Sequence, residues 1–153
     1  MKKIITIVCA SLLIIAGFVL SYSLVVQHQR MEKVKAITEI SLSEIDEVGI
    51  CHVGTGEIAH FFTPIEKETF VKVLNNAKVS LKPRKEEKGQ MMMGGPPAHF
   101  RIKKTDEEII EFFSFNTFLE IDGRRYECDY QSGSRLRNYL ITYYDKLTEN
   151  KGS

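Results

Sequence analysis

FLEIDGRRYECDY, residues 118–130, is the stretch of sequence that decides the fold. Its Asp-Gly pair, Asp122 and Gly123, lies between two runs of alternating apolar residues, which is a strong signal for a two-residue β-hairpin turn. A two-residue loop places Ile121 opposite Arg124, and strand alternation then predicts one shared apolar face. That face holds Leu119, Ile121, Tyr126, Cys128 and Tyr130. Turn chemistry and hydrophobic pattern therefore agree on an antiparallel hairpin.

The residues before this hairpin extend it into a β-meander. Residues 108–115 are almost continuously apolar, which predicts a central strand that is covered on both faces. Residues 99–103 alternate, with Phe100 and Ile102 on one face, and residues 79–82 are typical of a short strand. After the hairpin, residues 134–147 carry apolar side chains at helical spacing. We expect them to form an amphipathic helix that packs on the sheet.

A second hairpin and a helix are predicted nearer the N-terminus. Residues 45–53 and 57–62 are rich in β-branched and aromatic side chains and flank a Gly-Thr-Gly turn. Thr63, Pro64 and Glu66 then form a strong helix start, because Thr63 can cap, proline suits the first helical position and Glu66 completes a capping box. The apolar stripe of this helix consists of Ile65, Phe70, Val73, Leu74 and Ala77, and we expect the helix to end near residue 78.

Strands that follow one another through tight turns pair antiparallel, so the fold class is α+β. We expect an N-terminal transmembrane helix, then a small domain with an antiparallel sheet. The domain runs hairpin, helix, β-meander and C-terminal helix, with its helices on one face of the sheet. The predicted domains are a short cytoplasmic N-terminus (1–3), a membrane helix or signal anchor (4–26), a tether (27–42), an extracytoplasmic domain (43–148) and a disordered tail (149–153).

The membrane prediction comes from residues 4–26, a run of 23 residues without a charge that follows Lys2 and Lys3. As a helix it is about 34 Å long, enough to cross a hydrocarbon core of roughly 30 Å. The alternative is a signal peptide cleaved after Ser23, although the apolar part of such peptides is usually only about 7–15 residues long. Cys9 is preceded by Val8, unlike an acylated cysteine, and is expected to be a buried membrane-helix residue. The positive-inside rule gives nearly a tie, because Arg30, Lys33 and Lys35 flank the other end of the run. An N-terminal segment that begins with Lys-Lys usually keeps its N-terminus in the cytoplasm, which sends the domain across the membrane.

Charge limits the partners of that domain. The whole chain of 153 residues has a net charge of +1, yet from Met31 onward 18 Lys and Arg face 20 Asp and Glu, a net charge of −2. A nucleic-acid binder needs a basic face for phosphates, so we expect no nucleic acid among the partners.

Two cysteines, Cys51 and Cys128, lie in predicted strands of the domain. An even count in an exported domain is compatible with a disulfide, and the alternative is a pair of small buried side chains that never meet. If the first hairpin closes through Thr55 and Gly56, Cys51 faces His60, and Cys128 could complete a zinc-like ligand set. No CxxC or HxxxH spacing supports that set, so ordinary strand residues are the preferred interpretation.

The most unusual local segment is Met91-Met92-Met93, followed after two glycines, two prolines and an alanine by His99. Thioethers select Cu(I), and His99 could add an imidazole, which makes these four residues weak candidates for a metal site. Methionines also suit adaptable partner surfaces, and the plainest interpretation is a loop that covers the edge of the sheet. We therefore assign no metal and no cofactor.

The sequence contains no nucleophile elbow, Walker loop, HExxH or dinucleotide fingerprint, and we predict no catalytic residues and no enzyme. The expected function is a single-pass membrane-anchored protein of the cell envelope. Its extracytoplasmic domain is expected to act as a non-catalytic binding or interaction module for an envelope protein. The alternative is copper handling through the methionine segment and His99. The sequence leaves the oligomeric state open.

Overall fold

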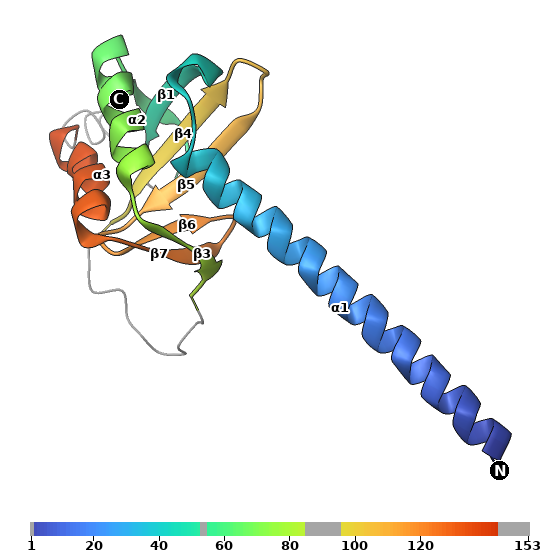
Figure 1. Ribbon diagram of the computed structural model, residues 1–153. Coiled ribbons are helices and arrows are strands. Elements are labelled where there is room, and N and C mark those ends of the chain that lie inside the picture. The colour runs from blue at the N-terminus through green and yellow to red at the C-terminus, as the bar shows by residue number, and fades with distance from the viewer. Residues whose placement is uncertain (1, 53–54, 85–95, 144–153) are drawn as a thin grey trace. The chain divides into compact units, whose positions relative to one another are not determined.

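The computed structural model describes residues 2–52, 55–84 and 96–143, with side chains from residue 14 onward (Figure 1). The elements are α1 (Lys2–Thr38), a 3₁₀ turn η1 (Leu42–Glu44), β1 (Ile45–Cys51), β2 (Ile58–Phe61), α2 (Pro64–Asn76), β3 (Val79–Pro83), β4 (Ala98–Lys104), β5 (Ile109–Ser114), β6 (Phe118–Ile121), β7 (Arg124–Cys128) and α3 (Tyr130–Thr142). Within these residues the strands form one antiparallel sheet of order β2-β1-β4-β5-β6-β7-β3. The predicted α+β class is confirmed.

The folded unit starts earlier in the chain than the sequence suggests. The chain divides into two units, residues 1–32 and 33–153, and the second unit begins within the last turns of α1. There Val34 and Ile37 of α1, and Ile40 just beyond its end at Thr38, are almost completely buried in the hydrophobic core. Where we expected a tether over 27–42, the structure thus has the end of a helix and core residues. Within the described part of the chain, no helix combines the length and apolarity that crossing a membrane requires.

The Asp-Gly turn forms as predicted. Asp122 and Gly123 have φ of 49° and 69°, which is a type I′ turn, and Ile121 pairs with Arg124. The predicted face is buried from Leu119 to Cys128, but Tyr130 is exposed. Its placement was wrong, because the strand ends at Cys128 and Tyr130 begins α3 instead.

The central strand β5 also differs from expectation. It lies in the middle of the sheet, but only one face of it is covered: Phe112 is buried, whereas Ile109 is 59% exposed and Glu111 is exposed. A continuous apolar run predicted cover on both faces, and the error arises because Glu111 interrupts that run on one face. The two faces of the sheet are therefore different surfaces.

Helix α2 begins with the predicted capping box. Thr63 accepts a hydrogen bond from the Glu66 amide, and the Glu66 carboxylate accepts one from the Thr63 amide. Phe70 and Leu74 are fully buried as expected. Ile65 was wrongly included in the stripe, since it is 78% exposed, and Val71 takes the buried position that the spacing missed.

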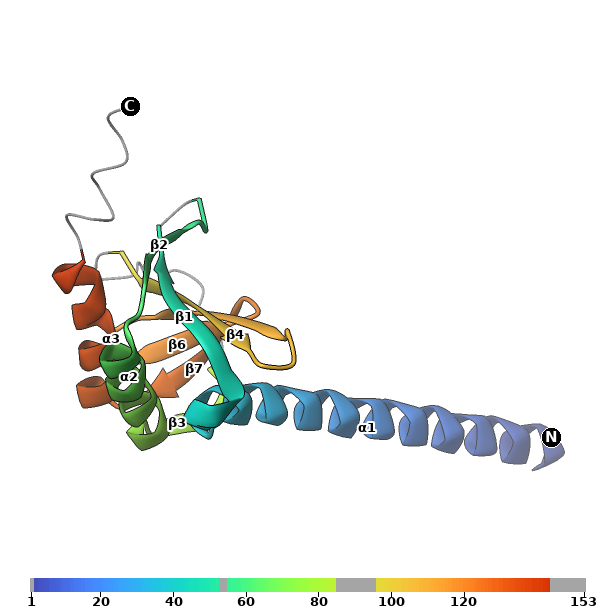
Figure 2. The ribbon, with the colours of Figure 1, turned by 90° about the horizontal axis from the view of Figure 1, so that it is seen from above.

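Helix α3 covers the same face of the sheet as α2, and the two helices lie side by side (Figure 2). It begins at Tyr130, earlier than predicted, because the Asp129 side chain caps it by accepting a hydrogen bond from the Ser132 amide. Gly133 is buried in its first turn, where an added Cβ would lie 2.4 Å from the Asn116 carbonyl oxygen. The predicted residues beyond 143, including Leu147 and the tail, lie outside the described residues.

Candidate functional site

The face of the sheet opposite α2 and α3 is the first candidate site. Strand alternation and the register assign its side chains, because Phe100 and Phe112 face the helices and their neighbours point the other way. We call this surface the open face. It carries Glu47, Gly49, Cys51, His99, Arg101, Lys103, Ile109, Glu111, Phe113, Phe118, Glu120 and Arg125.

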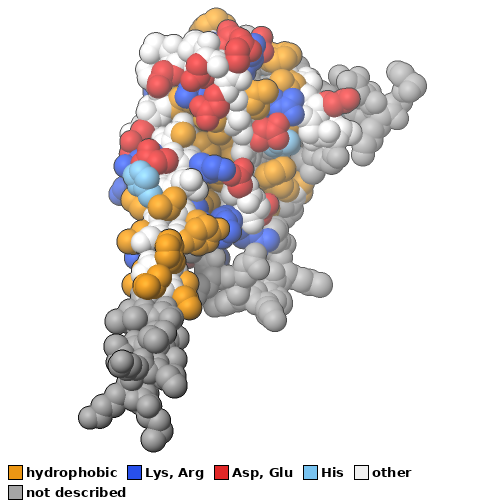
Figure 3. Space-filling view, turned by 90° about the vertical axis from the view of Figure 1, so that its right-hand side faces the viewer, with side chains coloured by type: hydrophobic (Ala, Val, Ile, Leu, Met, Phe, Trp, Pro, Cys, Tyr) orange, Lys and Arg blue, Asp and Glu red, His pale blue; other side chains and the backbone are white. Residues whose placement is uncertain are grey.

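Charges on the open face are paired across strands. Arg101 Nε lies 2.5 Å from Glu111 Oε1, and Arg125 Nε lies 3.3 Å from Glu120 Oε2. The Arg125 guanidinium also lies 5.3 Å from the centre of the Phe118 ring, a cation–π distance. Acidic, basic and hydrophobic side chains are likewise interspersed on the side of the folded unit seen in Figure 3. The face is a mixed surface on which Arg101 and Arg125 are each paired with a glutamate of the neighbouring strand.

His99 is the buried polar residue of this face. It is 5% exposed, and its ring stacks on Phe113 with centroids 4.3 Å apart. Its Nε2 is 3.6 Å from Glu111 Oε2, beyond hydrogen-bond distance, and has no hydrogen-bond partner among the described residues. Burial lowers the pKa of His99, and Arg101 adds to this effect while Glu111 opposes it. The imidazole is therefore neutral at pH 7.

The two domain cysteines do not meet. Cys51 and Cys128 are buried free thiols, and β1 and β7 are four strand spacings apart in the sheet, about 19 Å. A disulfide needs Cα atoms within about 7 Å, so of the two alternatives that the sequence left open, this strand order fits the pair of buried side chains that never meet. Burial raises the pKa of each thiol to about 11.

The zinc-like set is not assembled either. The β1–β2 register pairs Ile50, not Cys51, with His60, and a bulge after Ile50 then pairs Cys51 with Ile58, so Cys51 does not face His60 as predicted. Among the described residues no group of three metal-ligating His, Cys, Asp or Glu side chains comes together. Met91, Met92 and Met93 lie outside the described residues, so the structure places only His99 of the copper candidates.

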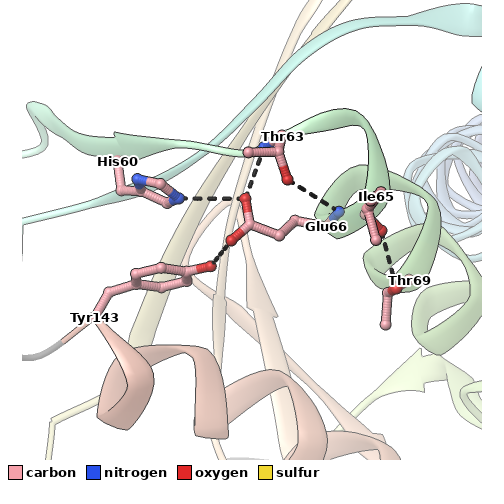
Figure 4. Close-up of polar contacts among 6 residues, drawn as sticks. All are labelled: His60, Thr63, Ile65, Glu66, Thr69 and Tyr143. Carbon is pink, nitrogen blue, oxygen red and sulfur yellow. Dashed lines mark hydrogen bonds and ion pairs between the residues drawn. The ribbon is translucent and has the colours of Figure 1, made fainter.

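A second polar cluster joins three elements at the start of α2 (Figure 4). Glu66 Oε2 lies 3.3 Å from His60 Nε2 of β2, and Glu66 Oε1 accepts a hydrogen bond from the Tyr143 hydroxyl at the end of α3. The His60 and Tyr143 rings stack with centroids 4.2 Å apart. Sequence analysis assigned Glu66 to the capping box alone, because the partners from β2 and α3 are distant in sequence.

Electrostatics in this cluster favour the ionised carboxylate. Partial burial alone would raise the pKa of Glu66, but hydrogen bonds from Tyr143, Thr63 and His60 outweigh it and lower the pKa to about 2. Burial and the bond to Glu66 raise the pKa of Tyr143. A strongly ionised Glu66 with a protonated Tyr143 is a structural arrangement: neither group is poised to exchange a proton near pH 7.

A comparison of the chain with protein-family models, with curated proteins and with solved structures found no match.

Proposed function

We propose that this chain is a single-pass membrane protein whose α+β domain lies on the extracytoplasmic side. There the domain binds an envelope protein through the open face, without catalysis of its own. The observation that carries the proposal is the difference between the two faces of the sheet. One face is covered by α2 and α3, and the other presents aromatic side chains beside compensated ion pairs. Such a mixture of aromatic and Arg side chains is typical of protein-binding surfaces.

The anchor is supported by the exposure of α1. Large apolar side chains between residues 14 and 25 are 55–74% exposed, and hydrophobic side chains gather along this helix in Figure 3. They are Ile14, Ile15, Phe18, Val19, Leu20, Tyr22, Leu24 and Val25. Residues 4–26 carry no charge, and leaving such a surface in water is costly at about 25 cal/mol per Å². A lipid environment removes that cost.

The anchor is tested by extraction of the full chain from membranes with alkaline carbonate. We expect it to stay in the membrane pellet. Each lysine placed near the middle of the run costs about 3 kcal/mol of insertion, so the variant Ile14→Lys/Phe18→Lys is expected to move to the soluble fraction. The matched control is Gln27→Lys/His28→Lys, which adds the same charge beyond the run and should remain in the pellet. Release of the unmodified chain by carbonate would refute the anchor.

Topology needs an added cysteine, because the native domain thiols are buried. Thr105 lies exposed in the β4–β5 turn, so Thr105→Cys in a Cys9→Ala background should react with an impermeant maleimide on intact cells. Labelling only after the cells are opened would place the domain in the cytoplasm.

The binding face is tested with a photoreactive amino acid at position 109 of β5, where Ile109 is 59% exposed on the open face. The control position is 68 on α2, where the Glu68 side chain is 54% exposed and lies outside that face. We expect crosslinks to one protein from position 109 and not from position 68 in intact membranes. Equal crosslinking from both positions, or none from position 109, would contradict the open face as a binding surface.

Copper handling remains the second candidate because of one observation, the buried Nε2 of His99, for which no described residue is a hydrogen-bond partner. A neutral imidazole nitrogen is a suitable ligand for Cu(I), and thioethers would supply the others. The test is a Cu(I) titration of the full chain in detergent. His99→Gln and Met91→Leu/Met92→Leu/Met93→Leu should each weaken binding, and unchanged binding in both variants would exclude this site.

A further inference from the structure

His99 lies on the open face beside the Arg101–Glu111 ion pair, so a proton on its ring would change the charge balance of that pair. It stands between two neighbouring strands, opposite Cys51 of β1 and opposite Phe113 of β5. The β1–β2 connection also approaches it, since an added Cβ at Gly56 would lie 3.9 Å from His99 Cε1. Neither Phe113 nor Gly56 offers a side-chain acceptor for a second N–H of the ring.

Among the described residues, two charged side chains act on the imidazole. Glu111 of β5 places Oε2 3.6 Å from Nε2, and Arg101 lies two residues along β4 on the same face. From β1 the neighbouring titratable group is the thiol of Cys51, which is neutral because burial raises its pKa to about 11. At neutral pH the site therefore contains the neutral ring of His99 and the ion pair of Arg101 with Glu111, so its net charge is zero.

Protonation of the ring changes this balance. A buried imidazolium needs acceptors for both of its N–H groups, and within the described parts of the chain Glu111 offers a carboxylate close to Nε2. A shift of about 0.7 Å would bring Oε2 from 3.6 Å to the normal N–H···O distance of roughly 2.9 Å. Glu111 would then divide its oxygens between His99 and Arg101, and the net charge of the three side chains would rise from zero to +1.

We propose that His99 makes binding at the open face sensitive to acid: protonation of His99 makes the single carboxylate of Glu111 serve two cations, His99 and Arg101, and leaves one uncompensated positive charge where the partner binds. Burying a compensated ion pair in an interface changes the binding free energy little, whereas burying an unpaired charge there weakens binding. Partner release in mildly acidic surroundings follows. This inference rests on the proposed function, since it concerns the same surface.

The first half of the test needs no partner. In NMR spectra of the full chain in detergent micelles, the His99 Cε1–H shift should titrate with a midpoint below 6.5, because the ring is buried neutral. The Arg101 Nε–H resonance should move with the same midpoint. In His99→Gln it should stay constant between pH 7.5 and 5.0, and the control His28→Gln should behave like the unmodified chain. In Glu111→Gln the His99 midpoint should fall by about one further pH unit, because the stabilising carboxylate is lost.

An Arg101 resonance that stays constant while His99 titrates would overturn the proposal. Movement of that resonance in His99→Gln would overturn it equally, since another group would then drive the change. The Glu111→Gln variant keeps His99 in place, so the test does not depend on whether His99→Gln folds.

The second half repeats the position-109 crosslinking in membranes at pH 7.5 and pH 5.0. We expect the yield to fall about tenfold at pH 5.0, the ratio equivalent to 1.4 kcal/mol, and to fall less than about twofold in His99→Gln. Equal yields at both pH values would overturn the acid sensitivity and leave the binding face standing. If the His99 and Arg101 resonances titrate together but no crosslink forms at either pH, the proposed function is refuted instead.

Discussion

The carboxylate of Glu66 accepts a hydrogen bond from the hydroxyl of Tyr143, which lies 77 residues further along the chain. One side chain thereby serves the N-terminal cap of α2 and the C-terminal end of α3, and the ring of His60 from β2 packs against both partners. A residue that sequence reasoning assigns to a local cap is thus also a tertiary contact between two helices and the edge of the sheet.

Replacement of Glu66 is therefore expected to lower the free energy of unfolding by more than the loss of a helix cap alone. Glu66→Ala removes the capping box and leaves the Tyr143 hydroxyl and His60 without their acceptor, so we expect a loss of about 2–3 kcal/mol. The measurement is urea unfolding of the full chain in detergent, followed by tyrosine fluorescence. Glu68→Ala is the control, since Glu68 forms only an exposed i,i+4 pair with Lys72, worth about 0.3–0.5 kcal/mol. Equal losses in the two variants would show that the bonds to Tyr143 and His60 contribute nothing.

The carboxyl group of Glu66 should also affect how the free energy of unfolding depends on pH in acid. Its pKa is about 2 in the folded chain against an ordinary value of 4.5, so the unfolded chain binds more protons between these values. The Glu66 contribution is complete above pH 4.5 and is lost as pH falls toward 2. Glu66→Gln should therefore unfold with a shallower dependence on pH between 4.5 and 2. An unchanged slope in that window would contradict the lowered pKa.

The domain cysteines should be unreactive in the folded chain. Cys51 and Cys128 are buried and the pKa of each is about 11, so little thiolate forms at pH 8. In a Cys9→Ala background we expect no rapid reaction with a thiol reagent in native buffer, and two labels per chain after denaturation without reductant. Labels that appear only after reduction would indicate a disulfide and would overturn the strand order.

Gly133 should tolerate no side chain. A Cβ there would lie 2.4 Å from the Asn116 carbonyl oxygen and 2.7 Å from that of Phe115, and both are backbone atoms with little freedom to move. We expect Gly133→Ala to destabilise the folded unit by about 2–3 kcal/mol, as overpacked sites do. The matched control is Gly17→Ala on α1, where an added Cβ meets no heavy atom within 4 Å. If thermal unfolding of Gly133→Ala matches that of the control, the close approach of α3 to this loop is wrong.

Features carried by neighbouring residues were predictable from sequence. The Asp122-Gly123 turn and the Thr63–Glu66 capping box depend on a few adjacent residues, and both form as expected. Long-range features were not. Val34 and Ile37 are buried in the core because they pack against residues that come much later in the chain. The β1–β2 hairpin forms in a register that places Ile50 opposite His60, and the bulge after Ile50 moves Cys51 one residue further away, to Ile58.

The candidate site shows the same division. The run of methionines before it drew attention to His99 in the sequence, but the role that we propose for it depends on Glu111, which the β4–β5 register brings across. A cross-strand carboxylate could be found from the sequence only once that register is known. The Tyr143 contact to Glu66 joins separate helices, and nothing in the residue pattern specifies it.

The position of α2 has a consequence for how the chain folds. β2 and β3 directly precede and follow α2, yet they form opposite edges of the sheet, about 29 Å apart across six strand spacings. The helix itself is about 20 Å long and crosses the sheet between these two edges. We therefore expect β2 and β3 to take their places only after the strands between them have formed. The meander from β4 to β7 consists of pairings between consecutive strands and pays little loop-closure entropy, whereas β1 must find β4 across about 50 residues. Folding is accordingly expected to start in the C-terminal half, and β1, although synthesised earlier, is expected to join the sheet last.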